Sequence, residues 1–160
     1  MSTATPFDRG TAAGTAPSTS RTLILSVRVV GAALLVACGW IHLHLWLDGY
    51  RDIPWIGPLF LANAVLAGLA ALAVLLTPAR WLPWASLLAG LLQLGTLGGL
   101  LLSLTVGLFG FFESPSAPLV VQTILVEAAG FLVLAGYGAT ELWRVWRSRR
   151  RTTRASSWAG

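Results

Sequence analysis

Charged side chains are scarce in this sequence of 160 residues. They make up 11% of the chain, whereas hydrophobic residues make up 56%. A soluble domain usually carries about 25% charged residues, so this chain has too few to cover a soluble core with polar surface. Its apolar runs reach the length of about 20 residues that crosses a bilayer as a helix. The composition therefore excludes an ordinary soluble domain and indicates an integral membrane protein.

Cysteine and histidine are also rare. Cys38 is the single cysteine, which excludes an intrachain disulfide. The two histidines, His42 and His44, are two residues apart, which puts them about 200° apart on a helix. They therefore cannot chelate one metal ion from a regular helix. A bis-histidine haem needs histidines from two helices, which only a symmetric dimer of this chain would supply. We expect no cofactor, while a metal or haem stays open as an alternative.

Four apolar segments follow one another with short connections. They cover about 23–47, 57–76, 84–112 and 119–143. Short connections make neighbouring helices antiparallel, so we predict an all-α, up-down four-helix transmembrane bundle over 21–146. Residues 1–20 are rich in Thr, Ala, Ser, Gly and Pro without periodicity and predict a disordered tail. Residues 147–160 form a basic cytoplasmic tail.

The arginines predict the orientation of the bundle. All eleven basic residues are arginine, and six of them follow the fourth segment. If both termini and the second connection are cytoplasmic, ten of the eleven are inside and only Arg51 is outside. We therefore predict a multi-pass protein of a bacterial plasma membrane with both termini inside. The basic tail is expected to contact anionic lipid, and we expect no nucleic-acid partner.

Small residues repeat along the third segment. Membrane helices associate closely where their facing residues are small. We therefore predict that this ladder packs another helix, either within the chain or in a homodimer. Its members recur every four residues: Gly95, Gly99, Ser103 and Gly107.

Glu127 is the most informative polar residue. It lies about nine residues into the fourth segment, roughly 13 Å deep at ~1.5 Å per residue, which is close to the bilayer midplane. Ionisable residues at this depth usually face the interior of the bundle and have a partner. Glu127 therefore marks either a proton or cation site or a carboxyl that hydrogen-bonds across helices, and whether it is charged stays open. Comparable depths on the other segments are predicted for Cys38, His42, Asn63 and Gln93.

Local spacing offers further pairs at the end of the first segment. Cys38 and His42 are four residues apart and share a helix face, so with Glu127 or Asn63 they are an alternative soft-metal site. His44 and Asp48 share a face in the same way. Their pair is interpreted either as an interfacial ion pair or as an outer pH-sensing group.

The connection after the first segment is rich in turn-forming residues. Within it, Arg51 is flanked by Asp48 and Asp52, which we expect to neutralise it. Leu35 to Cys38 also matches a lipoprotein cleavage motif, so lipidation of Cys38 is a further alternative. The long apolar segment that continues past Cys38 argues against it.

Three stretches carry a resemblance: HLHLW, GYRDIP and IGPLFLANAV, within about residues 39–65. They resemble a pattern in uncharacterised small four-helix integral membrane proteins of actinobacteria. The resemblance implies the fold and the membrane location, and it transfers no activity or catalytic residue.

Three classes of function follow from these features. The first is a non-enzymatic membrane protein that assembles with itself or with a larger complex and has a polar site in its outer half. The second is a small proton-coupled transporter or channel that uses Glu127. The third is a metal or redox-cofactor protein that uses Cys38 and His42. No nucleophile–base pair, phosphate-binding loop or soluble domain is visible, so an enzyme is disfavoured without being excluded.

Overall fold

A computed structural model describes residues 18–156, and this part of the chain is all-helical. Its elements are α1 (Ser18–Leu47), the short 3₁₀ helix η1 (Tyr50–Asp52), α2 (Ile56–Leu76), α3 (Leu82–Thr105) and α4 (Val120–Ser156). Within the described residues there is no β-strand, only an isolated bridge between Leu108 and Phe111. The predicted all-α class with four long helices is confirmed.

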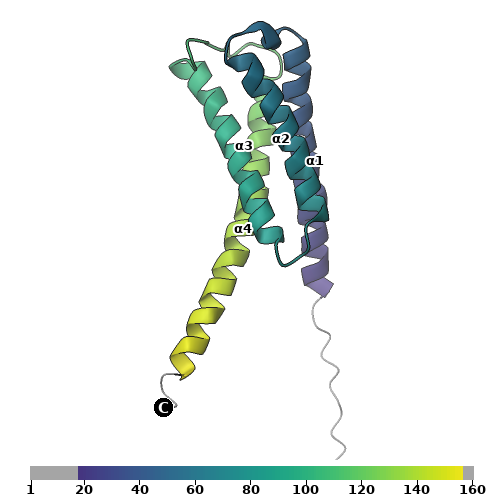
Figure 1. Cartoon of the computed structure of the whole chain (residues 1–160), viewed down its shortest axis with the longest axis vertical. Coiled ribbons are helices and arrows are strands. Elements are labelled where there is room, and N and C mark those ends of the chain that lie inside the picture. The colour runs from purple at the N-terminus through teal and green to yellow at the C-terminus, as the bar shows by residue number, and fades with distance from the viewer. Residues whose placement is uncertain (1–17, 157–160) are drawn as a thin grey trace, which may run out of the picture.

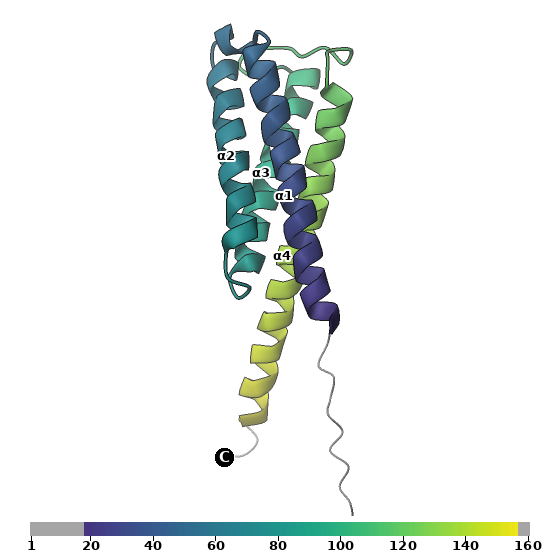
Figure 2. The same cartoon turned by 90° about the vertical axis from the view of Figure 1, so that its right-hand side faces the viewer.

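Consecutive helices run in opposite directions (Figures 1 and 2). One end of the bundle carries the connections 48–55 and 106–119, and we call it the cap end. The other carries the connection 77–81 together with the start of α1, and we call it the base end. Beyond the base end, α4 continues as a single helix that leans away from the others (Figure 1).

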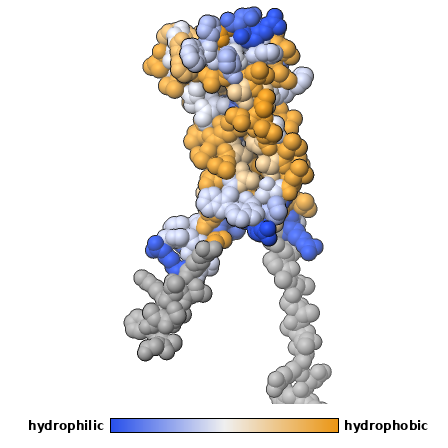
Figure 3. Space-filling view, in the orientation of Figure 1, coloured by the Kyte–Doolittle hydropathy of each residue, from blue (hydrophilic) through white to orange (hydrophobic). Residues whose placement is uncertain are grey.

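Each long helix contains a stretch with the length and apolar character of a membrane span. These stretches are Arg21–Leu47, Ile56–Leu76, Leu82–Thr105 and Val120–Ser148. The surface view shows a hydrophobic band between more hydrophilic ends (Figure 3). Four such helices indicate a multi-pass membrane protein. The inward orientation of both termini stays a prediction from the arginine positions.

The helix ends differ from the predicted ranges in three places. α3 ends at Thr105 instead of 112, because Gly107 and Gly110 have positive φ angles of 88° and 81° and turn the chain out of the helix. α1 begins at Ser18, inside the segment 1–20 that was predicted as a disordered tail. α4 continues to Ser156 through most of the basic tail. For residues 1–17 and 157–160, the predictions lie outside the described part of the chain.

The base half is closed by apolar packing. Its core cluster consists of Ala32, Leu35, Ala71, Val74, Leu82, Ala89 and Leu134. α3 and α4 approach each other closely here, because a methyl group on Gly90 would lie 2.6 Å from the backbone nitrogen of Ala135. Close contact at a glycine is how membrane helices associate without a hydrophobic driving force.

Arg28 of α1 forms hydrogen bonds with the end of α2. Its guanidinium donates hydrogen bonds to the carbonyl oxygens of Val74, at 2.7 Å, and of Leu75 and Thr77. The last carbonyls of a helix lack partners within the helix, and cationic side chains are favoured there by the helix dipole. Arg28 therefore has a capping role in addition to its contribution to the predicted orientation.

Candidate functional site

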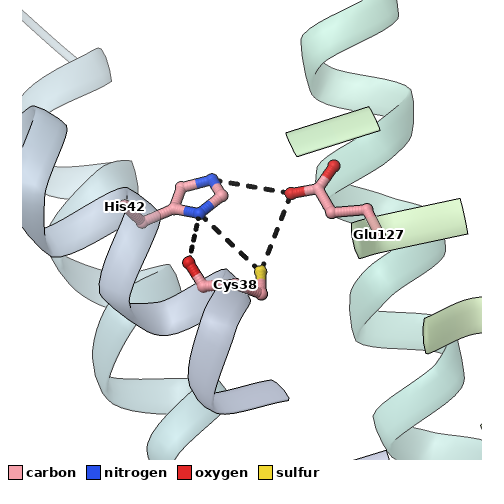
Figure 4. Close-up of side chains that lie close together, drawn as sticks. All are labelled: Cys38, His42 and Glu127. Atoms are coloured by element: carbon pink, nitrogen blue, oxygen red, sulfur yellow. Dashed lines mark hydrogen bonds and ion pairs between the residues drawn. The ribbon is translucent and has the colours of Figure 1, made fainter. Parts of the chain in front are cut away.

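Three buried side chains from two helices meet in the cap half. Cys38 and His42 come from α1 and Glu127 comes from α4 (Figure 4). The Cys38 Sγ atom lies 3.7 Å from Oε1 of Glu127, and Nε2 of His42 lies 3.7 Å from the same oxygen. The exposed fraction is 0% for Cys38 and Glu127 and 8% for His42. This arrangement brings a thiol, an imidazole and a carboxyl together away from water.

Helical geometry and one backbone hydrogen bond orient this group. Cys38 and His42 are one turn apart, so both point toward α4. The Nδ1 atom of His42 lies 2.9 Å from the carbonyl oxygen of Cys38. Because a carbonyl oxygen only accepts, Nδ1 carries a proton, and Nε2 faces Oε1 of Glu127. From α2, the Nδ2 atom of Asn63 reaches the Cys38 sulfur at 3.5 Å.

Four of the five residues predicted for the intramembrane layer are thus in contact: Cys38, His42, Asn63 and Glu127. Gln93 is buried too, but it lies against Gly130 on α4, and neither its Nε2 nor its Oε1 atom has a hydrogen-bond partner. Oδ1 of Asn63 and Oε2 of Glu127 are also unpaired and buried. Buried polar atoms nearly always have a partner, so the cap half holds several polar atoms that its own side chains do not satisfy.

A cavity of about 420 Å³ adjoins the cluster, and its lining comes from all four long helices and from the connection 106–119. Its walls are mostly apolar, and its polar lining consists of His42, Asn63, Thr96, Ser103, Glu113 and Thr123. The volume is within the range of about 300–1,000 Å³ that small-molecule sites occupy. The cluster therefore lies beside a space large enough for an organic ligand.

The glycine ladder does not pack α3 against another helix of this chain. A Cβ atom on Gly95 would have no neighbour within 4 Å, and one on Gly99 would meet only Leu108 at 3.8 Å. Both glycines and Ser103 line the cavity, while Gly107 lies beyond the end of α3. The closest contacts of α3 and α4 are made at other glycines, which include Gly90, Gly130 and Gly138. The small residues of the ladder therefore leave room for the cavity, and a role in a homodimer stays a prediction.

An aromatic and carboxylate group closes the cap end of the cavity. Tyr50 donates a hydrogen bond of 2.8 Å to Oε2 of Glu113, and its ring lies 4.9 Å from that of Phe60. Burial and the bond to Glu113 raise the pKa of Tyr50. The Phe60 ring in turn contacts His42, at 5.0 Å between centroids. Sequence reasoning missed this group because Tyr50 and Glu113 are far apart in the chain, and the only signal was that both follow apolar segments.

The outer-face residues predicted beside Arg51 form only part of the expected network. Arg51 pairs with Asp52, at 3.5 Å between Nε and Oδ2, on the exposed surface. Among the described ion pairs there is none between His44 and Asp48 or between Arg51 and Asp48. His44 is exposed and stacks on Trp40 instead, at 6.3 Å between ring centroids. The two histidines therefore have separate environments, as their spacing requires.

Comparison with known proteins gives no relative from which a role for these residues could be inferred. No protein-family model, no curated protein and no solved structure matches this chain.

Proposed function

We propose that this chain is a non-enzymatic membrane protein of a bacterial plasma membrane that binds a lipid-soluble molecule in its cap half. The observation that carries the proposal is the cavity of about 420 Å³, whose mostly apolar wall includes a few polar side chains, among them Asn63, Thr96 and Thr123. An apolar pocket with a few convergent polar groups is typical of a small-molecule site.

The polar groups of the wall define the chemistry of the ligand. The hydroxyls of Thr96, Ser103 and Thr123 line the cavity, and each donates its proton to a backbone carbonyl close by in the chain. Their oxygens are left to accept, so the ligand has a hydroxyl or amide donor. The remaining lining is largely leucine, glycine and phenylalanine, which favours an apolar body. A long-chain alcohol, a phenol or a fatty amide has both parts.

The position of the cavity favours entry from the bilayer. Leu59, Leu66 and Leu91 line the cavity, and each is also 45–49% exposed on the outer surface of the helices. A ligand dissolved among lipid chains therefore meets the cavity wall directly between α2 and α3.

Self-association or assembly into a larger membrane complex is a further part of the proposal. Gly68 and Gly136 have no neighbour within 4 Å of a built Cβ, so another helix can approach closely there. At the base end, Arg147 and Arg150 lie over the rings of Trp143 and Trp146. Tryptophan with arginine is typical of the membrane interface, which supports contact of this segment with anionic lipid.

Proton-coupled transport through Glu127 is the second candidate, because His42 contacts Glu127 and also lines the cavity. Transport needs a continuous path across the bundle, whereas the base half is filled by its apolar core cluster. Binding therefore accounts for the geometry better than transport. Uptake by proteoliposomes that Glu127→Gln abolishes without unfolding the protein would favour transport instead.

Photolabelling tests the binding proposal. The purified full chain in lipid nanodiscs is irradiated with a long-chain alcohol that carries a diazirine and an alkyne, and with the matching alkane that lacks the hydroxyl. We expect the alcohol to label the protein more strongly than the alkane. Gly95→Leu places a side chain in the cavity, so it should lower the alcohol labelling to the level of the alkane.

Gly98→Leu is the matched control on the same helix, because Gly98 also has no neighbour within 4 Å but lies outside the cavity lining. It should leave the labelling unchanged. Equal labelling of wild type and Gly95→Leu would reject the cavity as the binding site.

A further inference from the structure

We propose that Cys38, His42 and Glu127 bind one divalent transition-metal ion, with Zn²⁺ as the best match. The proposal is independent of the ligand in the cavity, because it depends on the three side chains and their distances. Each residue offers a ligand atom, and the three atoms lie within 4.8 Å of one another. All three residues are buried in the described structure.

Two of the distances between the ligand atoms are close to those around a shared metal, and the distance from His42 to Glu127 is longer than a hydrogen bond. Zinc lies about 2.3 Å from thiolate sulfur and about 2.0–2.2 Å from imidazole nitrogen or carboxylate oxygen, so tetrahedral ligands are roughly 3.4–3.6 Å apart. Sγ of Cys38 and Nε2 of His42 each lie 3.7 Å from Oε1 of Glu127. A nitrogen–oxygen hydrogen bond is shorter, about 2.7–3.2 Å. The Cys38 sulfur also lies 3.7 Å from Nδ1 of His42, so coordination through Nε2 needs the thiol to shift toward Nε2 and Glu127.

The histidine is already oriented as a metal ligand. Its Nδ1 proton is held by the carbonyl oxygen of Cys38 at 2.9 Å, which leaves the lone pair on Nε2. Metal-binding histidines usually donate their second ring nitrogen in this way, and the hydrogen bond fixes both the tautomer and the ring orientation. Figure 4 shows Nε2 turned toward Glu127 and Nδ1 turned back toward α1.

The charge of a divalent ion also suits the burial of this group. Among the described residues no arginine forms an ion pair with Glu127. Binding of the metal releases the thiol proton of Cys38, and one thiolate and one carboxylate then neutralise a 2+ ion. The complex with neutral His42 has no net charge, so the cost of burying isolated charges in an apolar medium is avoided.

The ligand types select the metal, and the cavity supplies a further coordination position. Thiolate and imidazole favour zinc over magnesium or calcium, which prefer oxygen ligands alone. His42 lines the cavity, so a water or a small ligand there can complete the tetrahedron. Three protein ligands leave the fourth position of a tetrahedral zinc ion open to a water or another small ligand.

Cobalt titration of the full chain tests this site. The protein is purified in detergent, stripped with a chelator and titrated with Co²⁺, a spectroscopic substitute for Zn²⁺. We expect one equivalent to bind with a sulfur-to-cobalt charge-transfer band, and Zn²⁺ to displace it. Cys38→Ser should abolish the band. Glu127→Gln removes a ligand and should weaken cobalt binding at least about 10- to 100-fold, because substitution of residues that only hydrogen-bond to a ligand already has an effect of that size.

His44→Gln is the matched control for His42→Gln, because His44 is exposed and stacks on Trp40 away from the cluster. His44→Gln should keep the band, and His42→Gln should lose it. Circular dichroism establishes that each variant is folded. Folded wild type that binds no stoichiometric cobalt would overturn the proposal, as would equal loss in both histidine variants. A wild-type result of this kind does not depend on any variant folding, and it leaves the photolabelling test of the cavity unaffected.

Discussion

The cap half and the base half of the bundle are built from similarly apolar helices, yet they are packed differently. In the base half, small residues bring backbones together around a core that includes Leu35 and Leu134. In the cap half, the small residues Gly95 and Gly99 leave a cavity instead of a close contact. Lipid offers no hydrophobic driving force between helices, so tight contact is what stabilises the fold. The difference indicates that the base half stabilises the bundle and the cap half carries the site.

Truncation of Leu134 should have the largest effect on stability. The side chain is fully buried and lies against Gly31. Leu134→Ala leaves a void, and we expect a loss of about 2–5 kcal/mol in the free energy of unfolding. Leu132→Ala is the control on the same helix, because Leu132 is 68% exposed. Unfolding in mixed micelles measures both variants, and equal losses would contradict the assignment of the base half as the stabilising region.

A methyl group on Gly90 should have an intermediate effect. It would meet the backbone nitrogen of Ala135 at 2.6 Å, and a backbone atom cannot turn aside as a side chain can. We expect Gly90→Ala to destabilise the protein by about 1–3 kcal/mol through overpacking. Gly98→Ala, on the same helix but with no neighbour within 4 Å, should not do so. The same unfolding assay compares the two, and an unaffected Gly90→Ala variant would show that α3 and α4 are not in close contact.

Removal of the Tyr50 hydroxyl should have the smallest effect. Tyr50→Phe loses the hydrogen bond to Glu113, which is worth about 1 kcal/mol. The folded protein holds the Tyr50 proton more tightly than the unfolded chain does, because burial and Glu113 raise the pKa. Wild type should therefore be more stable than Tyr50→Phe at pH 7, and this advantage should fall as the pH rises above about 10, where an unfolded tyrosine ionises. Thermal unfolding of both proteins at several pH values measures the gap, and a gap that stays constant up to pH ~11 would contradict this account.

The four long helices could be predicted from the length of the apolar runs, but the residue at which α3 ends could not. Hydropathy does not distinguish a helix from the apolar turn after Thr105, where Gly107 and Gly110 adopt positive φ angles. The bond from Arg28 to the end of α2 was also beyond prediction, since it joins residues 46 positions apart in the chain.

The depth of each site residue in the membrane could be predicted from its position in its apolar segment. Depth alone placed Cys38, His42, Asn63 and Glu127 in one layer, and the structure brings their side chains together. Which side chains then meet depends on the rotation of each helix about its axis, and sequence spacing does not determine that rotation. Gln93 therefore lies in the predicted layer but faces Gly130, and the glycine ladder lines a cavity instead of a helix contact.

Mapping the photolabelled positions tests most directly whether the cap half, and not the base half, carries the ligand site. After irradiation with the alcohol probe, the wild-type protein is digested and the modified peptides are identified by mass spectrometry. This account predicts modification within the segments that line the cavity, which are 42–45, 56–66, 91–113 and 118–123. Modification concentrated in the base half, within 71–90, or spread evenly along the exposed faces of all four helices, would contradict it.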